Sequence, residues 1–173
     1  MIKFYGILND RKTIITDNNT ISRLCEKNIG EKHKSFLVLD EYETMYLLDN
    51  NWLELKSDKK KINAKKYLET LILEKKEFLQ KYQVYFEFKN LGYIIKTGLK
   101  FGFDFRVYPK GKKIDDFHTK YVVSVISENK KITTKDLAKS IRLSIGLNTE
   151  ILIAIVDNEF DVTYYKFSRE KIK

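Results

Sequence analysis

The segment EILIAIVD, at positions 150–157, is the strongest strand signal in the sequence. Six aliphatic residues, 151–156, follow one another without a polar interruption. A continuous apolar run of this length predicts a strand buried on both faces, as in the middle of a sheet. Residues 158–161, three of which are polar, predict a tight turn, and VTYYKF at 162–167 predicts a strand that returns beside the first.

The residues on the amino-terminal side of this segment predict the rest of a sheet. Residues 121–126 are apolar at nearly every position and indicate another central strand. Thr133 or Thr134 can cap a helix between the two strands, with apolar residues on one face at Leu137, Ala138, Ile141 and Ile145. Residues 93–97 and 104–108 read as two further strands. This half of the chain is therefore expected to be an α/β (α+β) domain with a central mixed sheet flanked by helices.

The first half of the chain alternates between short strands and short helices. Asp40 followed by Glu43 is a capping box, which predicts a helix from residue 41. The other expected elements are strands at 3–8, 13–16 and 52–55, a helix at 21–28 and a charged loop at 58–61. We expect a small mixed α/β domain here.

A long helical pattern joins the two halves. It starts at Asn63, which can cap a helix, and ends before Gly92, which is suited to the position after a helix end. A helix of this length is predicted to break near residues 80–82, so the domains are expected at 1–80 and 81–173. Since no Pro-, Gly- or Ser-rich linker marks the boundary, the halves are expected to pack together.

Composition limits the classes of function. The 173 residues include 33 Lys and Arg against 24 Asp and Glu, a net charge of +9. This excess makes nucleic acid the default partner, although a lysine-coated surface explains it equally well. No apolar run reaches membrane-spanning length and the first residues do not form a secretory signal, so we expect a cytoplasmic protein without membrane contact. One Cys and two His cannot build an internal disulfide or a metal cluster, so no metal or other cofactor is expected.

No nucleotide-binding or metalloprotease motif is present, and no pair of carboxylates stands out by its spacing. Histidine is therefore the most informative residue type. His33 lies in a charged turn, which indicates a solvated side chain. His118 ends a polar loop just before the strand at 121–126, and loops at strand ends often carry functional groups.

Three segments of the second half resemble the archaeal tRNA-splicing endonucleases, which cut introns from precursor tRNA at bulge-helix-bulge structures. These segments are LGYIIKTGLKFGFDFRVY at 91–108, ILIAIVD at 151–157 and VTYY at 162–165. Their order and spacing are similar to those of the family, while the first half resembles it more loosely. The resemblance therefore covers nearly the whole chain and implies the family's two-domain fold.

The resemblance implies a catalytic site of tyrosine, histidine and lysine that needs no metal. Tyr108 and His118 occupy the first two places, but the lysine place, eight residues before Asp157, holds Thr149. In the family reaction a 2′-hydroxyl attacks the adjacent phosphate and leaves a 2′,3′-cyclic end. Tyrosine acts as base, histidine as acid, and lysine stabilises the charge on the phosphorane.

The resemblance also implies binding residues. Arg142 matches an arginine used at the RNA bulge, and Arg106 could contact a phosphate or an internal carboxylate. The acidic turn with Asp157, Glu159 and Asp161 corresponds to a loop that docks into a basic pocket of a neighbouring subunit. In isolation, the turn and Arg142 would also be typical of an ordinary solvated surface.

Three hypotheses follow, all with RNA as partner. In the first, the chain is the structural subunit of a heteromeric endonuclease acting on precursor tRNA, paired with a catalytic subunit, for example in a heterotetramer. In the second, it is a self-sufficient endonuclease, dimeric or tetrameric, in which Lys120 or Lys166 replaces the missing lysine. The third is a general RNA-binding module. The strand at 162–167 could also extend a sheet across a homodimer.

Overall fold

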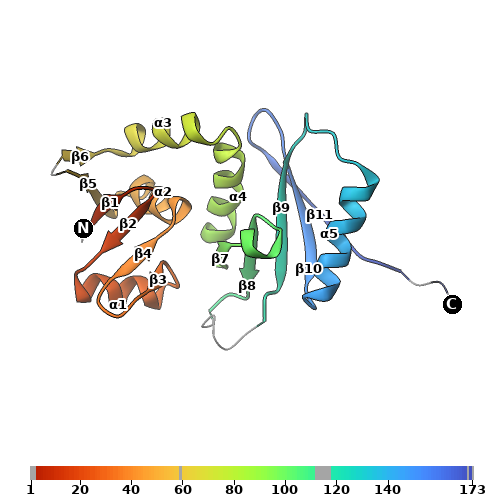
Figure 1. Ribbon diagram of the computed structural model, residues 1–173, viewed down its shortest axis with the longest axis horizontal. Helices are drawn as coiled ribbons and strands as arrows, with labels where there is room; N and C mark the ends of the chain where they lie inside the picture. Colours follow the sequence, from red (N-terminus) through yellow and green to blue (C-terminus); the bar gives the residue numbers. More distant parts are fainter. Residues whose placement is uncertain (1–2, 59, 112–117, 171, 173) are drawn as a thin grey trace. The chain divides into compact units, whose positions relative to one another are not determined.

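The computed structural model of the chain describes residues 3–58, 60–111, 118–170 and 172 (Figure 1). The chain forms two compact units, Met1–Lys76 and Glu77–Lys173. The division lies four residues before the boundary expected from the sequence. No helix in the described ranges is both long enough and apolar enough to cross a membrane.

Unit 1 is built on a mixed sheet whose described strands run in the order β3-β4-β2-β1-β5-β6. β1 pairs in parallel with β5, and the other neighbours are antiparallel. The strands are β1 (Phe4–Asn9), β2 (Lys12–Ile15), β3 (Glu31–Lys32), β4 (Leu37–Leu39), β5 (Leu53–Ser57) and β6 (Lys60–Ile62). The helices are α1 (Asn18–Glu26), α2 (Glu41–Asp49) and α3 (Ala64–Glu74). The small mixed α/β domain expected from the sequence is confirmed.

The capping box of α2 forms as the sequence predicts and also connects the helix to the preceding loop. Asp40 accepts from the backbone N–H of Glu43 at 2.8 Å, and Glu43 accepts from that of Asp40 at 3.1 Å. The second carboxylate oxygen of Glu43 accepts from Gly30 N–H at 2.8 Å. Because the Glu43 side chain is buried, these N–H groups depend on it rather than on water.

Two details of the sequence-based prediction are wrong. The long helix breaks at residues 75–77 instead of 80–82, because Lys75 is extended and ends α3, while α4 (Phe78–Asn90) starts after Glu77. Ion pairs hold both sides of the break: Lys75 pairs with Glu41, and Glu77 pairs with Lys81 and Lys130. The charged run at 58–61 is not all loop, because Lys60–Ile62 pairs with β5 as strand β6.

Unit 2 contains a mixed sheet in the order β11-β10-β9-β8-β7. β9 and β10 are parallel, and the other neighbours are antiparallel. Besides α4, the elements are β7 (Ile94–Thr97), the 3-10 turn η1 (Leu99–Phe101), β8 (Phe105–Tyr108), β9 (Tyr121–Ser127), α5 (Thr134–Gly146), β10 (Glu150–Val156) and β11 (Val162–Phe167).

Helices cover both faces of this sheet, as predicted (Figure 1). On one face, Tyr85 of α4 contacts Phe105, with ring centroids 6.1 Å apart. On the other face, Ile141 of α5 packs against a core formed by Phe103, Val122 and Ile151. Strand register confirms the two faces, because Phe105 pairs with Val123, whereas Val122 pairs with Ile151. These faces are called the α4 face and the α5 face below.

Replacing Glu43 by Ala should destabilise unit 1 by about 2–4 kcal/mol, because two partly buried backbone N–H groups lose their acceptor. Urea titration followed by fluorescence can measure this, since the single tryptophan, Trp52, lies in unit 1. Glu69→Ala is the matched control, because Glu69 is an exposed helical residue of the same unit. Equal midpoints for the two variants would contradict the structural role of Glu43.

Candidate functional site

One edge of the unit 2 sheet gathers most of the residues singled out in the sequence. Tyr108 is the last residue of β8, and the backbone N–H of Lys120, just before β9, donates to Val107 at 2.8 Å. Thr149 stands just before β10, whose first residue, Glu150, pairs with Tyr121. His118 lies two residues before Lys120 and is exposed. The ends of three neighbouring strands therefore bring Tyr108, Thr149 and the segment that follows His118 to the same edge.

Thr149 is bound to the chain segment that follows His118. Its hydroxyl donates to the carbonyl oxygen of Thr119 at 2.9 Å and lies 3.1 Å from that of Lys120. Thr149, Thr119 and Lys120 all line a hollow of about 430 Å³. Its lining also includes Ile145, Asn148 and Glu150. Position 149 therefore carries no positive charge, and its one hydroxyl proton already has an acceptor.

The two lysines considered as replacements lie on the opposite face from Tyr108. Tyr108 follows Arg106 by two residues and lies on the α5 face, whereas Tyr121 and Glu150 lie on the α4 face. The Lys120 Nζ is 5.0 Å from the Tyr121 ring centroid, and Lys166 forms a 2.7 Å ion pair with Glu150. Both ammonium groups are therefore held on the α4 face.

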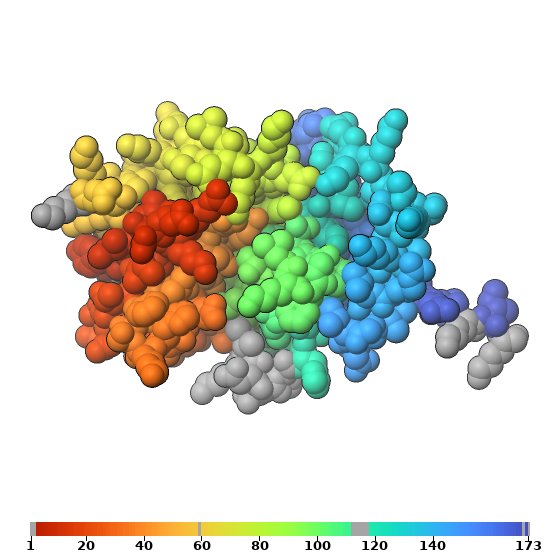
Figure 2. All heavy atoms as spheres, viewed as in Figure 1, coloured from red at the N-terminus to blue at the C-terminus, as the bar shows by residue number. Residues whose placement is uncertain are grey.

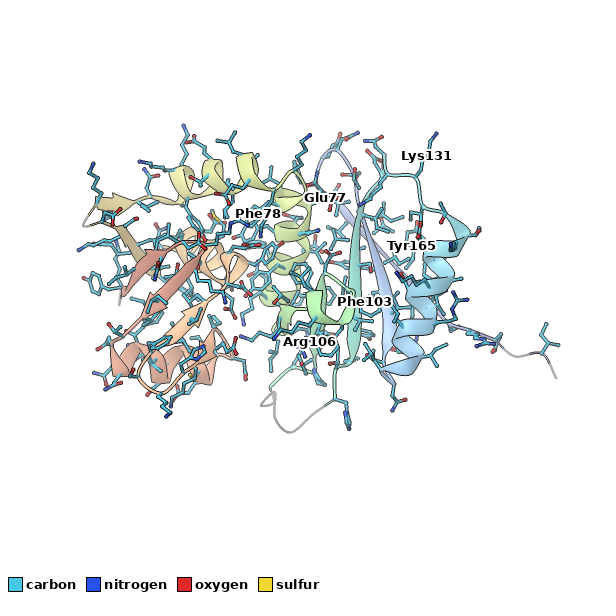
Figure 3. All side chains as sticks on the ribbon, viewed as in Figure 1. Glu77, Phe78, Phe103, Arg106, Lys131 and Tyr165 are labelled. Carbon is cyan, nitrogen blue, oxygen red and sulfur yellow. The ribbon has the colours of Figure 1, made fainter. Side chains whose placement is uncertain are left out.

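Arg106, labelled in Figure 3, lies on the α5 face like Tyr108, two residues further along β8. Its guanidinium carbon is 4.7 Å from the centroid of the Phe101 ring and 5.8 Å from that of Tyr108. Its Nε is buried and finds no hydrogen-bond partner within the described ranges. A cation placed near two aromatic rings keeps its attraction for an incoming anion.

Arg142 lines a groove between η1 and α5. Phe101, the ring next to Arg106, lines the same groove. The groove measures about 600 Å³, and Figure 2 shows the green surface around η1 next to the blue surface of α5. Lys100 and Lys139 join Arg142 in its lining, together with the exposed Leu143. Three cations beside an aromatic ring provide groups suited to phosphate binding and base stacking.

The acidic turn lies at the other end of β10. Asp157 folds the turn itself, because its carboxylate accepts the N–H groups of Glu159 and Asp161, each at 2.9 Å. The Glu159 and Asp161 side chains are exposed. Eight residue steps along an extended strand separate Thr149 from Asp157, or about 25 Å. The turn therefore cannot complete the Tyr108 edge of its own chain.

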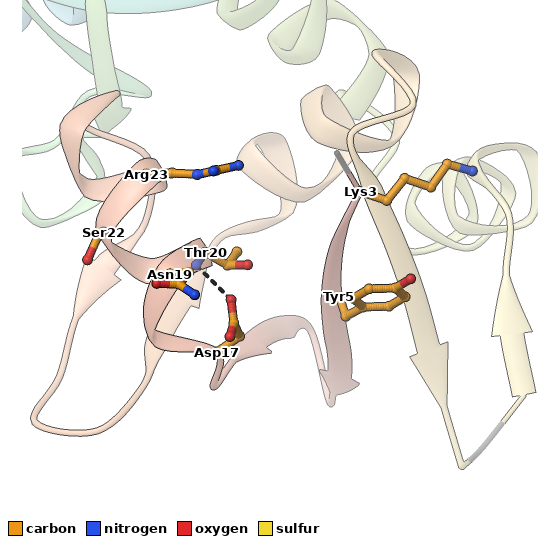
Figure 4. A pocket seen from close by; sticks show the side chains of 7 residues that line it. All are labelled: Lys3, Tyr5, Asp17, Asn19, Thr20, Ser22 and Arg23. Carbon is orange, nitrogen blue, oxygen red and sulfur yellow. Dashed lines mark hydrogen bonds between the residues drawn. The ribbon is translucent and has the colours of Figure 1, made fainter. Parts of the chain in front are cut away.

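A second hollow lies in unit 1, between α1 and β1, and measures about 720 Å³ (Figure 4). Its lining includes Lys3, Tyr5 and Arg23. The carboxylate of Asp17 there accepts from Thr20 N–H at 2.7 Å, and hydrogen bonding to Thr20 holds the pKa of Asp17 below its ordinary value. Asp17 therefore caps α1. The Tyr108 edge, where most of the residues singled out in the sequence gather, is the better candidate site.

The sequence analysis did not single out Tyr93, Lys110 or Tyr121, whose side chains accompany Lys120 at the same sheet edge. These residues are separated along the chain, so no local motif indicates them. Within the described ranges, no group of three or more His, Cys, Asp or Glu side chains could hold a metal ion.

Comparison with known proteins gives matches in both units. The family model for the tRNA intron endonuclease catalytic C-terminal domain matches residues 78–164, and the model for the N-terminal domain of the same family matches residues 4–68. A tRNA-splicing endonuclease of Methanococcus vannielii is 36% identical over 167 residues, 95% of this chain and 93% of the relative. One of Thermococcus gammatolerans is 36% identical over 168 residues, 96% of each chain. One of Methanothermobacter thermautotrophicus is 34% identical over 161 residues, 92% of this chain and 94% of the relative.

Asp157→Ala should open the acidic turn, because two N–H groups lose a charged acceptor. Amide hydrogen exchange at Asp161 should accelerate about 10-fold, the equivalent of roughly 1.4 kcal/mol of local stability. Glu159→Ala removes the same charge without removing an acceptor and should leave that exchange rate unchanged. Equal acceleration in both variants would show that charge, and not the carboxylate hydrogen bonds, holds the turn.

Proposed function

Because this chain belongs to the tRNA intron endonuclease family, we propose that it takes part in excising introns from precursor tRNA as the structural subunit of a heteromeric endonuclease. In this role it positions a bulge-helix-bulge RNA and a separate catalytic chain cuts it. The proposal depends above all on Thr149, which occupies the place that the family resemblance gives to lysine.

The chemistry explains why this one position matters. Transfer of a phosphoryl group through a phosphorane places extra negative charge on the phosphate oxygens, and a fixed cation stabilises that charge. Removing such a group typically costs about 3–4 kcal/mol, or about 10²–10³ in rate. Lys120 and Lys166 do not supply the charge, because Lys120 lies over Tyr121 and Lys166 pairs with Glu150 on the other face.

The acidic turn supports a role between subunits. Asp157 organises the turn and leaves the carboxylates of Glu159 and Asp161 exposed. The turn is also about 25 Å of extended strand away from Thr149, so its charge acts on another molecule rather than on this site. A basic pocket of the catalytic subunit is the binding place that we assign to it.

Two arginines are the groups that we assign to the precursor tRNA. Arg142 lies in the basic groove beside α5, where a base of the bulge could stack against its guanidinium. Arg106 has a buried Nε without a partner in the described ranges and could bind a phosphate next to Tyr108. Positioning RNA in this way requires no lysine at position 149.

The purified chain should not cut a bulge-helix-bulge RNA by itself, whereas Thr149→Lys should gain at least about 10²-fold in rate over that background. Cleavage should be measured at low salt and without metal. Thr149→Met is the matched control, because it has similar length to lysine but no charge. Cutting by the unaltered chain at a rate that Thr149→Lys does not improve would contradict the proposal.

One observation favours a self-sufficient endonuclease as a second candidate: Tyr108 and His118 are both present, with the Arg106 guanidinium near the Tyr108 ring. In that case His118 is the acid that protonates the leaving oxygen. Replacing His118 by Ala should then abolish cleavage by the unaltered chain, with a loss of about 10²–10⁴. An unchanged rate would exclude this candidate.

A further inference from the structure

Two tyrosines and two lysines form a continuous cluster at the sheet edge, here called the lysine–tyrosine strip: Tyr93, Lys110, Lys120 and Tyr121. The Nζ of Lys110 is 4.7 Å from the centroid of the Tyr93 ring, and that of Lys120 is 5.8 Å from the same centroid. Lys120 is also 5.0 Å from the Tyr121 centroid. Both lysines are exposed and both tyrosines are half-buried, so the strip is a surface of positioned cations.

The end of α4 fixes the central ring of this strip. Gly92 follows the helix with φ of +83°, a conformation that glycine adopts without the strain a side chain would bring. The turn lets Tyr93 N–H donate to the Phe88 carbonyl at 3.0 Å, and the two rings pack edge to face at 5.6 Å. The position of the Tyr93 ring is therefore set by the fold, and the two lysines lie near a ring that is already positioned.

The acids around the strip, as far as the chain is described, leave its two lysines without an ion pair. No carboxylate within the described ranges forms an ion pair with Lys110 or Lys120, and nearby Glu150 already pairs with Lys166 at 2.7 Å. Cation–π contacts place an ammonium group but do not cancel its charge. The strip therefore presents two positive charges around one ring, 4.7 and 5.8 Å from its centroid.

We propose that the lysine–tyrosine strip is a binding site for the phosphate backbone of RNA, separate from the Tyr108 site. This proposal rests on the proposed function for the presence of RNA. The strip lies on the α4 side of the edge whose α5 side carries Tyr108, as the position of Lys120 over Tyr121 indicates. An RNA strand that passes over this edge would contact both, and Lys110 and Lys120 would each bind one phosphate.

RNA explains these features better than an acidic protein segment does. Phosphates follow one another along a nucleic acid at regular intervals, so two lysines gathered around one ring suit a repeated anion. An exposed part of a tyrosine ring can in addition stack on an unpaired base. The whole chain, at +9, is attracted to a polyanion of either kind, so the test must separate this site from general charge.

The test is the salt dependence of binding of a bulge-helix-bulge RNA by the full chain. In the double variant Lys110→Ala/Lys120→Ala, the slope of log K against log salt should fall by about 1.5–2, near one unit for each phosphate that no longer binds a lysine. Lys110→Arg/Lys120→Arg should keep the slope of the unaltered chain. Melting temperatures should remain unchanged, because both side chains are exposed.

The matched control is Lys65→Ala/Lys66→Ala, which removes the same charge from exposed positions in unit 1. An equal fall in slope for both double variants would overturn the proposal, since general charge would explain the binding. An unchanged RNA slope with weakened binding of the catalytic subunit would also overturn it and make the strip a protein-docking surface.

The proposed function can be wrong while this inference is right, and the two outcomes can be told apart. If the unaltered chain binds bulge-helix-bulge RNA no better than a fully paired duplex, the splicing role is contradicted. A fall in slope confined to Lys110→Ala/Lys120→Ala would still support the strip as an RNA site in that case.

Discussion

The parallel pairing of β9 with β10 determines where Thr149, Arg142 and the acidic turn lie. Two adjacent parallel strands begin at the same edge of a sheet and end at the other. Residues that precede them, Lys120 and Thr149, are therefore neighbours, and the turn that follows β10 is carried to the far end. The crossover that parallel pairing requires is α5, which supplies Arg142 and covers the sheet.

The alternation of side chains along β8 and β9 adds a second constraint. It places Arg106 and Tyr108 on one face and Tyr121 with Glu150 on the other. Neighbouring positions in sequence thus serve different surfaces. Lys120 precedes β9, and its ammonium group lies near the Tyr93 and Tyr121 rings. A shift of one residue in the β8–β9 register would exchange the two surfaces, which makes this register essential to the proposed division of roles.

Much of the fold could be predicted from the sequence, because its signals are local. The apolar run at 151–156 and the capping box of Asp40 with Glu43 appear in the structure as strand β10 and helix α2. The helix break could not be placed, because Tyr67 and Leu71 before it and Phe78 and Tyr82 after it continue one apolar pattern. Only the tertiary surroundings of Lys75 and Glu77 separate the two helices.

The candidate site was less visible in the sequence. His118 stands out by its residue type and its place before a strand. Tyr108 and Thr149 stand out only through the family resemblance, since residue type alone gives little reason to choose one tyrosine among eleven. The direction in which Lys166 points depends on strand register, and Tyr93 contacts Lys110 and Lys120 only after the chain has folded. Such contacts between distant segments leave no pattern in a single sequence.

The position of the acidic turn has a consequence for how subunits meet. A chain with a net charge of +9 repels its own copies and other basic chains at low ionic strength. Glu159 and Asp161 are exposed on a turn that Asp157 has already ordered, so negative charge is concentrated at one end of unit 2. Such an uneven charge distribution gives unit 2 an electric dipole. When the partner is a basic chain, encounters in which the acidic turn faces that partner are favoured. Association with such a partner would become faster and more selective without any increase in the final contact area.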